Sequence, residues 1–150
     1  MQYKRRKGKK ITNAKKHTED GITFASGLEL YCYRQLNKAK IPHEYEGKTF
    51  ELVEKFKFEG LLMDKGKTKG KKVFKEMTGN IPDFINLDAG FIIETKGLRT
   101  PVFSMRFKLF LKHLQDENKQ LDIYIPSNQK EVDATIESIL SRGNFKKQKS

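Results

Sequence analysis

The chain has 150 residues, a mass of 17.5 kDa and a formal net charge of +12, from 31 Lys and Arg against 19 Asp and Glu. A length of this order suits one domain and excludes a second independent one. The excess of positive charge predicts a polyanionic partner, while a hydrophobic content of 36%, with 11 Phe, argues against wholesale disorder.

Basic segments stand at both ends of the chain and in its middle. Residues 1–16 carry eight Lys or Arg and no acidic residue, which is typical of a flexible basic arm. Residues 146–150 form a basic tail, so the folded domain is expected to span residues 17–145. A run rich in Lys and Gly at 64–72 predicts a hairpin tip or a mobile loop, within an insertion near 62–79.

The first half of the domain predicts one helix followed by strands. Ser26 is a suitable N-cap, and apolar residues follow at helical spacing until Pro42 ends the helix. These apolar residues are Leu28, Tyr31, Cys32, Leu36 and Ala39. Residues 43–58 alternate with period two and predict strands, and segments 83–87 and 90–96 predict two more strands joined as a hairpin.

The second half predicts two helices and one strand. The dipeptide Thr100-Pro101 fits the N-cap and first position of a helix that ends by the polar residues at 116–118. Residues 121–126 predict a short strand, and residues 131–140 predict a closing helix that stops near Gly143. This order of elements predicts an α/β fold with a mixed central β-sheet flanked by α-helices.

The sequence also indicates where the protein works. No stretch reaches the ~18–20 apolar residues that span a bilayer, and no apolar leader follows the N-terminus. The single cysteine, Cys32, cannot form an internal disulfide and is expected in the core rather than as a nucleophile. We therefore expect an unexported protein of the reducing cytoplasm, with no membrane partner, because a basic amphipathic helix with Trp is also missing from the sequence.

Two acidic residues and a lysine fall on neighbouring predicted strands. Pro82-Asp83 is followed, after ten residues, by Glu94-Thr95-Lys96. Because side chains alternate along a strand, Glu94 and Lys96 share one face, and Asp83 converges on it if the two strands pair. Two carboxylates suit a hard divalent cation such as Mg²⁺, and Lys96 would then face a phosphate.

This set of residues suits the hydrolysis of a phosphodiester. A metal held by carboxylates polarises oxygen and acidifies bound water, while Lys96 would orient or deprotonate the water or stabilise the developing charge. Glu29, beside the apolar stripe of the first helix, can look along the sheet. Each half of the pattern also occurs by chance, but the apolar run at 91–93 predicts that Glu94 is buried, and a buried Glu–Lys pair needs a compensating ligand.

These motifs resemble the signature of the PD-(D/E)XK nuclease superfamily and, in order and spacing over about residues 22–98, the phage endonuclease I family of Holliday-junction resolvases. The resemblance is carried by Ser26-Gly27-Leu28-Glu29, Gln35-Leu36, His43-Glu44-Tyr45-Glu46, Pro82-Asp83-Phe84 and Ile93-Glu94-Thr95-Lys96-Gly97-Leu98. The flanking residues 20–26, 100–103 and 108–110 also look like those of short phage-encoded nucleases of this superfamily.

The resemblance implies a restriction-endonuclease-like core and a Mg²⁺-dependent endodeoxyribonuclease, with Mn²⁺ as a substitute. Glu29, Asp83 and Glu94 would ligate the metal, and Lys96 would be the catalytic lysine. The implied substrate is branched DNA in phage recombination or processing, inside the host cell. A homodimer is implied too, with chains that can be intertwined so that Glu29 completes the partner's site, although the insertion at 64–72 departs from the family pattern.

Basic residues outside the acidic set are expected to contact DNA phosphates. They are Lys4, Arg5, Arg6, Lys67, Lys69, Lys71, Arg99, Arg106, Lys108 and Lys112. Two other functions stay open: a restriction-like or recombination nuclease acting on duplex DNA or strand ends, and a non-catalytic DNA-binding module. The module is disfavoured because carboxylates that face phosphates without a metal would repel them.

Overall fold

The structure is a computed structural model that describes residues 15–68, 70, 72–79 and 82–143. Several expected DNA contacts lie outside the described residues, namely Lys4, Arg5, Arg6, Lys69 and Lys71, and so does the basic tail at 146–150. Within the described ranges, no helix is long and apolar enough to cross a membrane.

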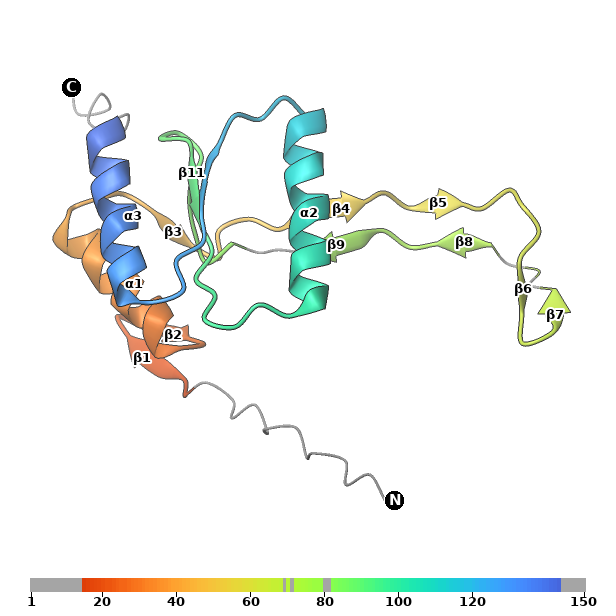
Figure 1. Cartoon of the computed structure of the whole chain (residues 1–150), viewed down its shortest axis with the longest axis horizontal. Helices are drawn as coiled ribbons and strands as arrows, with labels where there is room; N and C mark the ends of the chain where they lie inside the picture. Colours follow the sequence, from red (N-terminus) through yellow and green to blue (C-terminus); the bar gives the residue numbers. More distant parts are fainter. Residues whose placement is uncertain (1–14, 69, 71, 80–81, 144–150) are drawn as a thin grey trace, which may run out of the picture.

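A four-stranded mixed sheet forms the centre of the protein (Figure 1). Its strands, in spatial order, are β12 (Asp122–Tyr124), β11 (Phe91–Ile93), β10 (Phe84–Asn86) and β3 (Glu44–Tyr45). β11 runs parallel to β12 and antiparallel to β10, which also pairs antiparallel with β3. The predicted hairpin and the mixed α/β class are therefore confirmed.

Three helices form close to where the sequence predicts them. They are α1 (Gly27–Lys38), α2 (Pro101–Asp116) and α3 (Gln129–Arg142). Ser26 and Thr100 are N-caps whose hydroxyl oxygens accept backbone N–H groups, as their positions predict. α3 begins two residues earlier than predicted, because Asn128 caps it, and it ends at Gly143, whose φ of 65° suits the left-handed C-cap.

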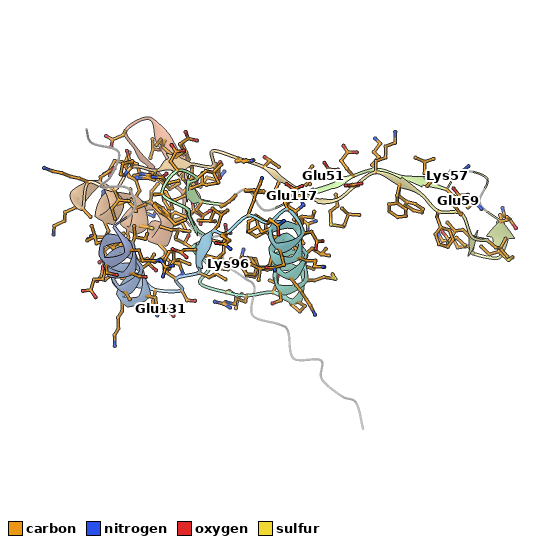
Figure 2. The ribbon with its side chains drawn as sticks, turned by 90° about the horizontal axis from the view of Figure 1, so that it is seen from above. Glu51, Lys57, Glu59, Lys96, Glu117 and Glu131 are labelled. Carbon is orange, nitrogen blue, oxygen red and sulfur yellow. The ribbon has the colours of Figure 1, made fainter. Side chains whose placement is uncertain are left out.

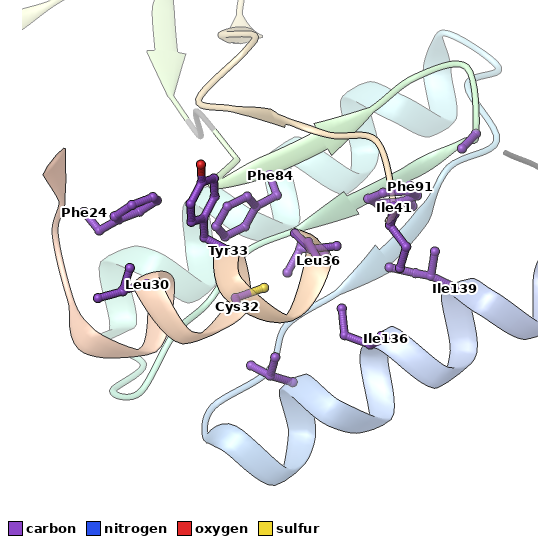
Figure 3. Packing of buried hydrophobic residues seen from close by; sticks show 13 residues of the cluster. Phe24, Leu30, Cys32, Tyr33, Leu36, Ile41, Phe84, Phe91, Ile136 and Ile139 are labelled. Atoms are coloured by element: carbon purple, nitrogen blue, oxygen red, sulfur yellow. The ribbon is translucent and has the colours of Figure 1, made fainter. Parts of the chain in front are cut away.

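The helices cover the two faces of the sheet. Because side chains alternate along strands, Phe84, Phe91 and Ile93 face a cluster shared with α1 and α3 (Figure 3). Ile85 and Ile92 face a second cluster, shared with α2. The sheet therefore lies between α1 and α3 on one side and α2 on the other.

The buried stripe of α1 differs from the predicted one. Leu30 and Tyr33 are buried, whereas Leu28 and Tyr31 are only partly covered. The reason is an additional small hairpin of β1 (His17–Glu19) and β2 (Ile22–Phe24), which packs against α1 and covers its start. Cys32 is fully buried, as predicted for a core residue.

A two-stranded arm extends from the body (Figure 1). Its successive pairs are β4 (Phe50–Val53) with β9 (Met77–Gly79), β5 (Phe56–Lys57) with β8 (Val73–Phe74), and β6 (Met63–Asp64) with β7 (Lys67–Thr68). Phe50 and Leu52 anchor its base in the cluster under α2. The predicted strands at 50–57 therefore belong to this arm and not to the central sheet, and the run at 64–72 includes the hairpin tip.

The packing of α2 gives a test of the fold. Leu114→Ala removes a side chain that is 4% exposed, so it should lower the free energy of unfolding by about 2–5 kcal/mol in urea denaturation. The same change at Leu61, which is 73% exposed on the arm, should alter the free energy of unfolding by less than about 0.5 kcal/mol. Equal losses at the two positions would contradict this assignment of the core.

Candidate functional site

The register of the β10–β11 hairpin brings two carboxylates together. Phe84 lies opposite Ile93 in the antiparallel ladder, so the next pair along the two strands is Asp83 and Glu94. Residues directly opposite each other have Cβ atoms about 4.5–5.5 Å apart. The two acids therefore meet at the end of the hairpin, as the sequence predicts for paired strands.

The regular strand ends at Ile93, whereas the sequence pattern extended it to residue 96. The N–H groups of Glu94 and Lys96 still donate to the carbonyl oxygens of Tyr124 (2.9 Å) and Pro126 (3.0 Å). Pro126 has no N–H group to return to this strand, so the parallel ladder stops here. Glu94 and Lys96 thus remain beside β12 but lie beyond the regular sheet.

Asp83 is buried and held by its neighbour across the hairpin. Asp83 is 7% exposed, and its Oδ2 accepts hydrogen bonds from the N–H and the hydroxyl of Thr95, both at 2.7 Å. Burial, and then repulsion from Glu29, raises the pKa of Asp83 to about 7, although the Thr95 bonds oppose this shift. Thr95 therefore fixes the orientation of Asp83.

Glu94 carries the least satisfied oxygen of the cluster. The apolar run at 91–93 predicts a buried Glu94, but the residue is only half-buried, because the regular strand ends before it. Its Oε2 is buried and accepts no hydrogen bond from any described residue. Burial, together with repulsion from Asp83, raises the pKa of Glu94 to about 8, while nearby Lys96 lowers it. The Lys96 Nζ lies 5.0 Å from the ring centroid of Phe103 on α2, a cation–π contact that positions the ammonium beside the acids.

Glu29 completes the acidic cluster from α1. It is 8% exposed, and its Oε2 accepts the hydroxyl of Tyr45 at 2.7 Å and the N–H of Ala25 at 3.1 Å. These donors compensate for its burial. The Glu29 charge raises the pKa of both Asp83 and Glu94, so the three carboxylates interact within a single chain.

Sequence reasoning assigned no site role to three neighbours of the cluster. Tyr45 and Thr95 lie inside the quoted motifs, and their ability to donate hydrogen bonds is the signal that could have identified them. Phe103 lies in the quoted flanking residues 100–103, but that pattern does not predict its contact with Lys96, which depends on how α2 docks.

The expected DNA contacts do not join the cluster. Those within the described residues are Lys67 on the arm and Arg99, Arg106, Lys108 and Lys112 on or next to α2. All of these residues are exposed, and Lys112 forms an ion pair with Asp116 at 2.7 Å. These residues contribute positive charge to the surface of the protein and are not part of the acidic cluster.

The donor set can be compared with the needs of a divalent cation. Over the parts of the chain that the structure describes, no group of three or more His, Cys, Asp or Glu side chains already surrounds a possible metal position. Thr95 and Tyr45 each hold one carboxylate oxygen, while Glu94 Oε2 has no donor among the described residues. Glu29 and Asp83 are buried and Glu94 is half-buried, and carboxylates that repel one another suit a hard cation as oxygen ligands, so the residues fit one.

The raised pKa values predict an unusual pH dependence for the metal-free protein. In the folded protein the pKa values of Asp83 and Glu94 lie well above the ordinary values near 4, so folding favours the protonated forms. The free energy of unfolding should therefore fall as pH rises from about 4 to about 8. In chelator, Glu94→Gln should melt a few degrees above wild type at pH about 8.5, and the gap should close near pH 4.5. Glu51→Gln, an exposed control on the arm, should track wild type. A gap independent of pH would contradict the burial of the Glu94 charge.

Comparison with known proteins places the chain in a family. The family model described as "Protein of unknown function (DUF1064)" matches residues 9–127, a range that holds the acidic cluster, the arm and α2. No curated protein and no solved structure matches the chain. Since the matched range covers well over half of the sequence, the chain belongs to the DUF1064 family.

Proposed function

We propose that this protein is a metal-dependent endodeoxyribonuclease that cleaves branched DNA such as a Holliday junction. The observation that carries the proposal is the cross-strand pair of buried Asp83 and half-buried Glu94, with Lys96 beside it. Burying like charges costs stability, and a bound cation that is needed for activity offsets that cost. The resemblance of the same residues to the PD-(D/E)XK motif supports this function.

Asp83 and Glu94 would hold Mg²⁺, or Mn²⁺ in its place, with Glu29 as a further oxygen donor. When bound, the ion supplies Lewis-acid polarisation of the phosphate and lowers the pKa of water. Thr95 and Tyr45 hold Asp83 and Glu29 in fixed orientations through short hydrogen bonds. This preorganisation reduces the rearrangement needed when substrate arrives.

Lys96 supplies the positive charge at the reacting group. Its ammonium interacts with Glu94 and lies over the Phe103 ring, which limits the positions it can adopt. From there it can donate hydrogen bonds to a phosphate oxygen or hold a water molecule in place for attack. A lysine in this position assists the step in which negative charge accumulates on the phosphate.

The surroundings of the cluster suit DNA and favour two copies of the chain. Arg99, Arg106 and Lys108 are exposed on or next to α2, and the net charge is +12. Such a surface binds phosphates through counterion release. Because one acidic cluster cuts one strand, cutting both strands at a junction would use a homodimer, which we include in the proposal.

The substrate can be identified by a direct comparison. A four-way junction and a linear duplex of the same sequence are incubated with the protein and Mg²⁺, and preferential cleavage of the junction is expected. Equal cleavage of the duplex would instead favour a restriction-like or recombination nuclease. Binding without any product would favour a non-catalytic DNA-binding module.

Substitutions in the cluster should abolish cleavage without preventing DNA binding. Asp83→Asn and Lys96→Ala should each reduce the rate of junction cleavage by about 10²–10⁴-fold, because each removes a group that acts on the reacting phosphate or water. Asp88→Asn, an exposed change on the turn of the same hairpin, should retain the wild-type rate. Unchanged cleavage by the Lys96→Ala or Asp83→Asn protein would exclude this site as the catalytic centre.

Metal binding should be visible in stability as well as activity. At about ten times its dissociation constant, Mg²⁺ should stabilise the folded protein by about 1.4 kcal/mol, measured as a rise in Tm at pH about 8. Glu94→Gln should lose most of this rise, while Asp88→Asn should keep it. Equal rises in all three proteins would show that the ion binds elsewhere.

A further inference from the structure

Within the described residues, the strands of the outer arm, β5 to β8, pair only with one another. Figures 1 and 2 show it extending beyond its base on α2, with Lys57 and Glu59 far out along it and Lys96 in the body. Isolated two-stranded ribbons are marginally stable in water. An extended ribbon of this kind is therefore best explained by a partner that completes it.

The two faces of the outer arm differ in chemistry. Phe56 lies opposite Phe74, and their rings stack with centroids 5.2 Å apart, so they share one face. The ladder continues outward, because the N–H of Phe58 donates to the carbonyl oxygen of Lys72 at 2.8 Å. Alternation places Phe58 on the aromatic face and Lys57 on the opposite one.

The tip of the arm combines exposed apolar and basic side chains. Leu61 is 73% exposed and Met63 is 57% exposed. The turn that follows brings Lys65 and Lys67 to the end of the arm, where both are exposed. Asp64 lies opposite Lys67 at this turn, and from residue 65 to residue 75 the sequence has six Lys and no acidic residue.

This composition fits DNA better than a second copy of the chain. Two copies would bring the same lysine-rich surfaces together, and lysine is depleted from protein–protein interfaces. Contacts from lysine to phosphate, in contrast, dominate DNA affinity. β-Ribbons enter DNA grooves, and exposed apolar side chains serve there as wedges.

The arm is at most about as long as one turn of the double helix. Ten residues lead from Val53 at the base to Met63, and Gly60 lies at a bend between them, so the span is at most the about 35 Å of a fully extended chain. One turn of B-DNA rises about 34–36 Å over about 10 base pairs. The tip can therefore reach the same side of a duplex as the base, one turn away.

We propose that the arm lies along duplex DNA and holds it about one helical turn from the base of the arm. Lys65 and Lys67 contact phosphates, and Leu61 and Met63 press into a groove. This inference rests on the proposed function in so far as DNA is the substrate. It adds that the protein requires a flank of duplex DNA at least one turn long.

The phosphate contacts can be measured through salt dependence. Full-length Asp83→Asn protein, which leaves DNA intact, is titrated with a fluorescent junction at several salt concentrations. Adding Lys65→Gln and Lys67→Gln should reduce the slope of log K against log salt by about 2, since each phosphate contact contributes about 0.9. The control pair Lys38→Gln and Lys130→Gln, exposed on α1 and α3, makes the same charge change and should leave the slope unaltered.

The outcomes separate this inference from the proposed function. If the Lys65→Gln and Lys67→Gln protein has the same salt slope as the control protein, while the wild-type protein still cleaves DNA, the arm does not contact DNA. The nuclease proposal then stands. If none of the proteins binds or cleaves DNA, both are wrong.

The dependence of binding on the length of the duplex flank tests the proposed reach of the arm. Junctions whose arms are shorter than about 10 base pairs should bind the Asp83→Asn protein several-fold more weakly than longer ones. Adding Leu61→Ser and Met63→Ser should remove this length dependence. If the length dependence persists in the protein with these two serines, the inference is wrong. It is also wrong if the arm substitutions convert a dimer to a monomer in sedimentation while the salt slope stays unchanged, because the arm would then join two copies of the chain.

Discussion

The antiparallel pairing of Phe84 with Ile93 is the constraint on which the acidic cluster depends. A slip of one residue would separate Asp83 from Glu94 and turn every side chain of the strand to the other face of the sheet. The register is held because Phe84 and Ile93 fill the cluster shared with α1 and α3, while the residues next to them fill the cluster under α2. Hydrophobic packing on both faces thus forces two carboxylates together.

The cost of that arrangement is visible in the surrounding hydrogen bonds. Thr95 gives Asp83 two donors and Tyr45 gives Glu29 one, but the buried Oε2 of Glu94 accepts none from the described residues. A fold optimised for stability alone would place apolar side chains at such positions. The cluster is therefore a place where the protein gives up stability, which is a recurrent property of functional sites.

Local signals in the sequence were sufficient for the helices and the hairpin, because caps such as Ser26 and Thr100 act within one turn of chain. They were insufficient for the arm, because alternation at 50–57 predicts a strand without identifying its partner, which lies at 73–79. The same limit applies to the site. Asp83, Glu94 and Lys96 follow from a motif, whereas the contact of Tyr45 with Glu29 depends on how β3 and α1 pack around the sheet.

The packing of α2 links the arm to the acidic cluster. Phe50 at the base of the arm packs edge-on against Phe110, with ring centroids 5.0 Å apart. Phe107 lies 6.0 Å from Phe110 and 5.7 Å from Phe103, whose ring holds the Lys96 ammonium. This row of rings along one helix fixes the base of the arm relative to Lys96, because packed aromatic side chains resist displacement. The proposed contact of the arm with DNA would need such a fixed origin, and the packing of α2 provides one.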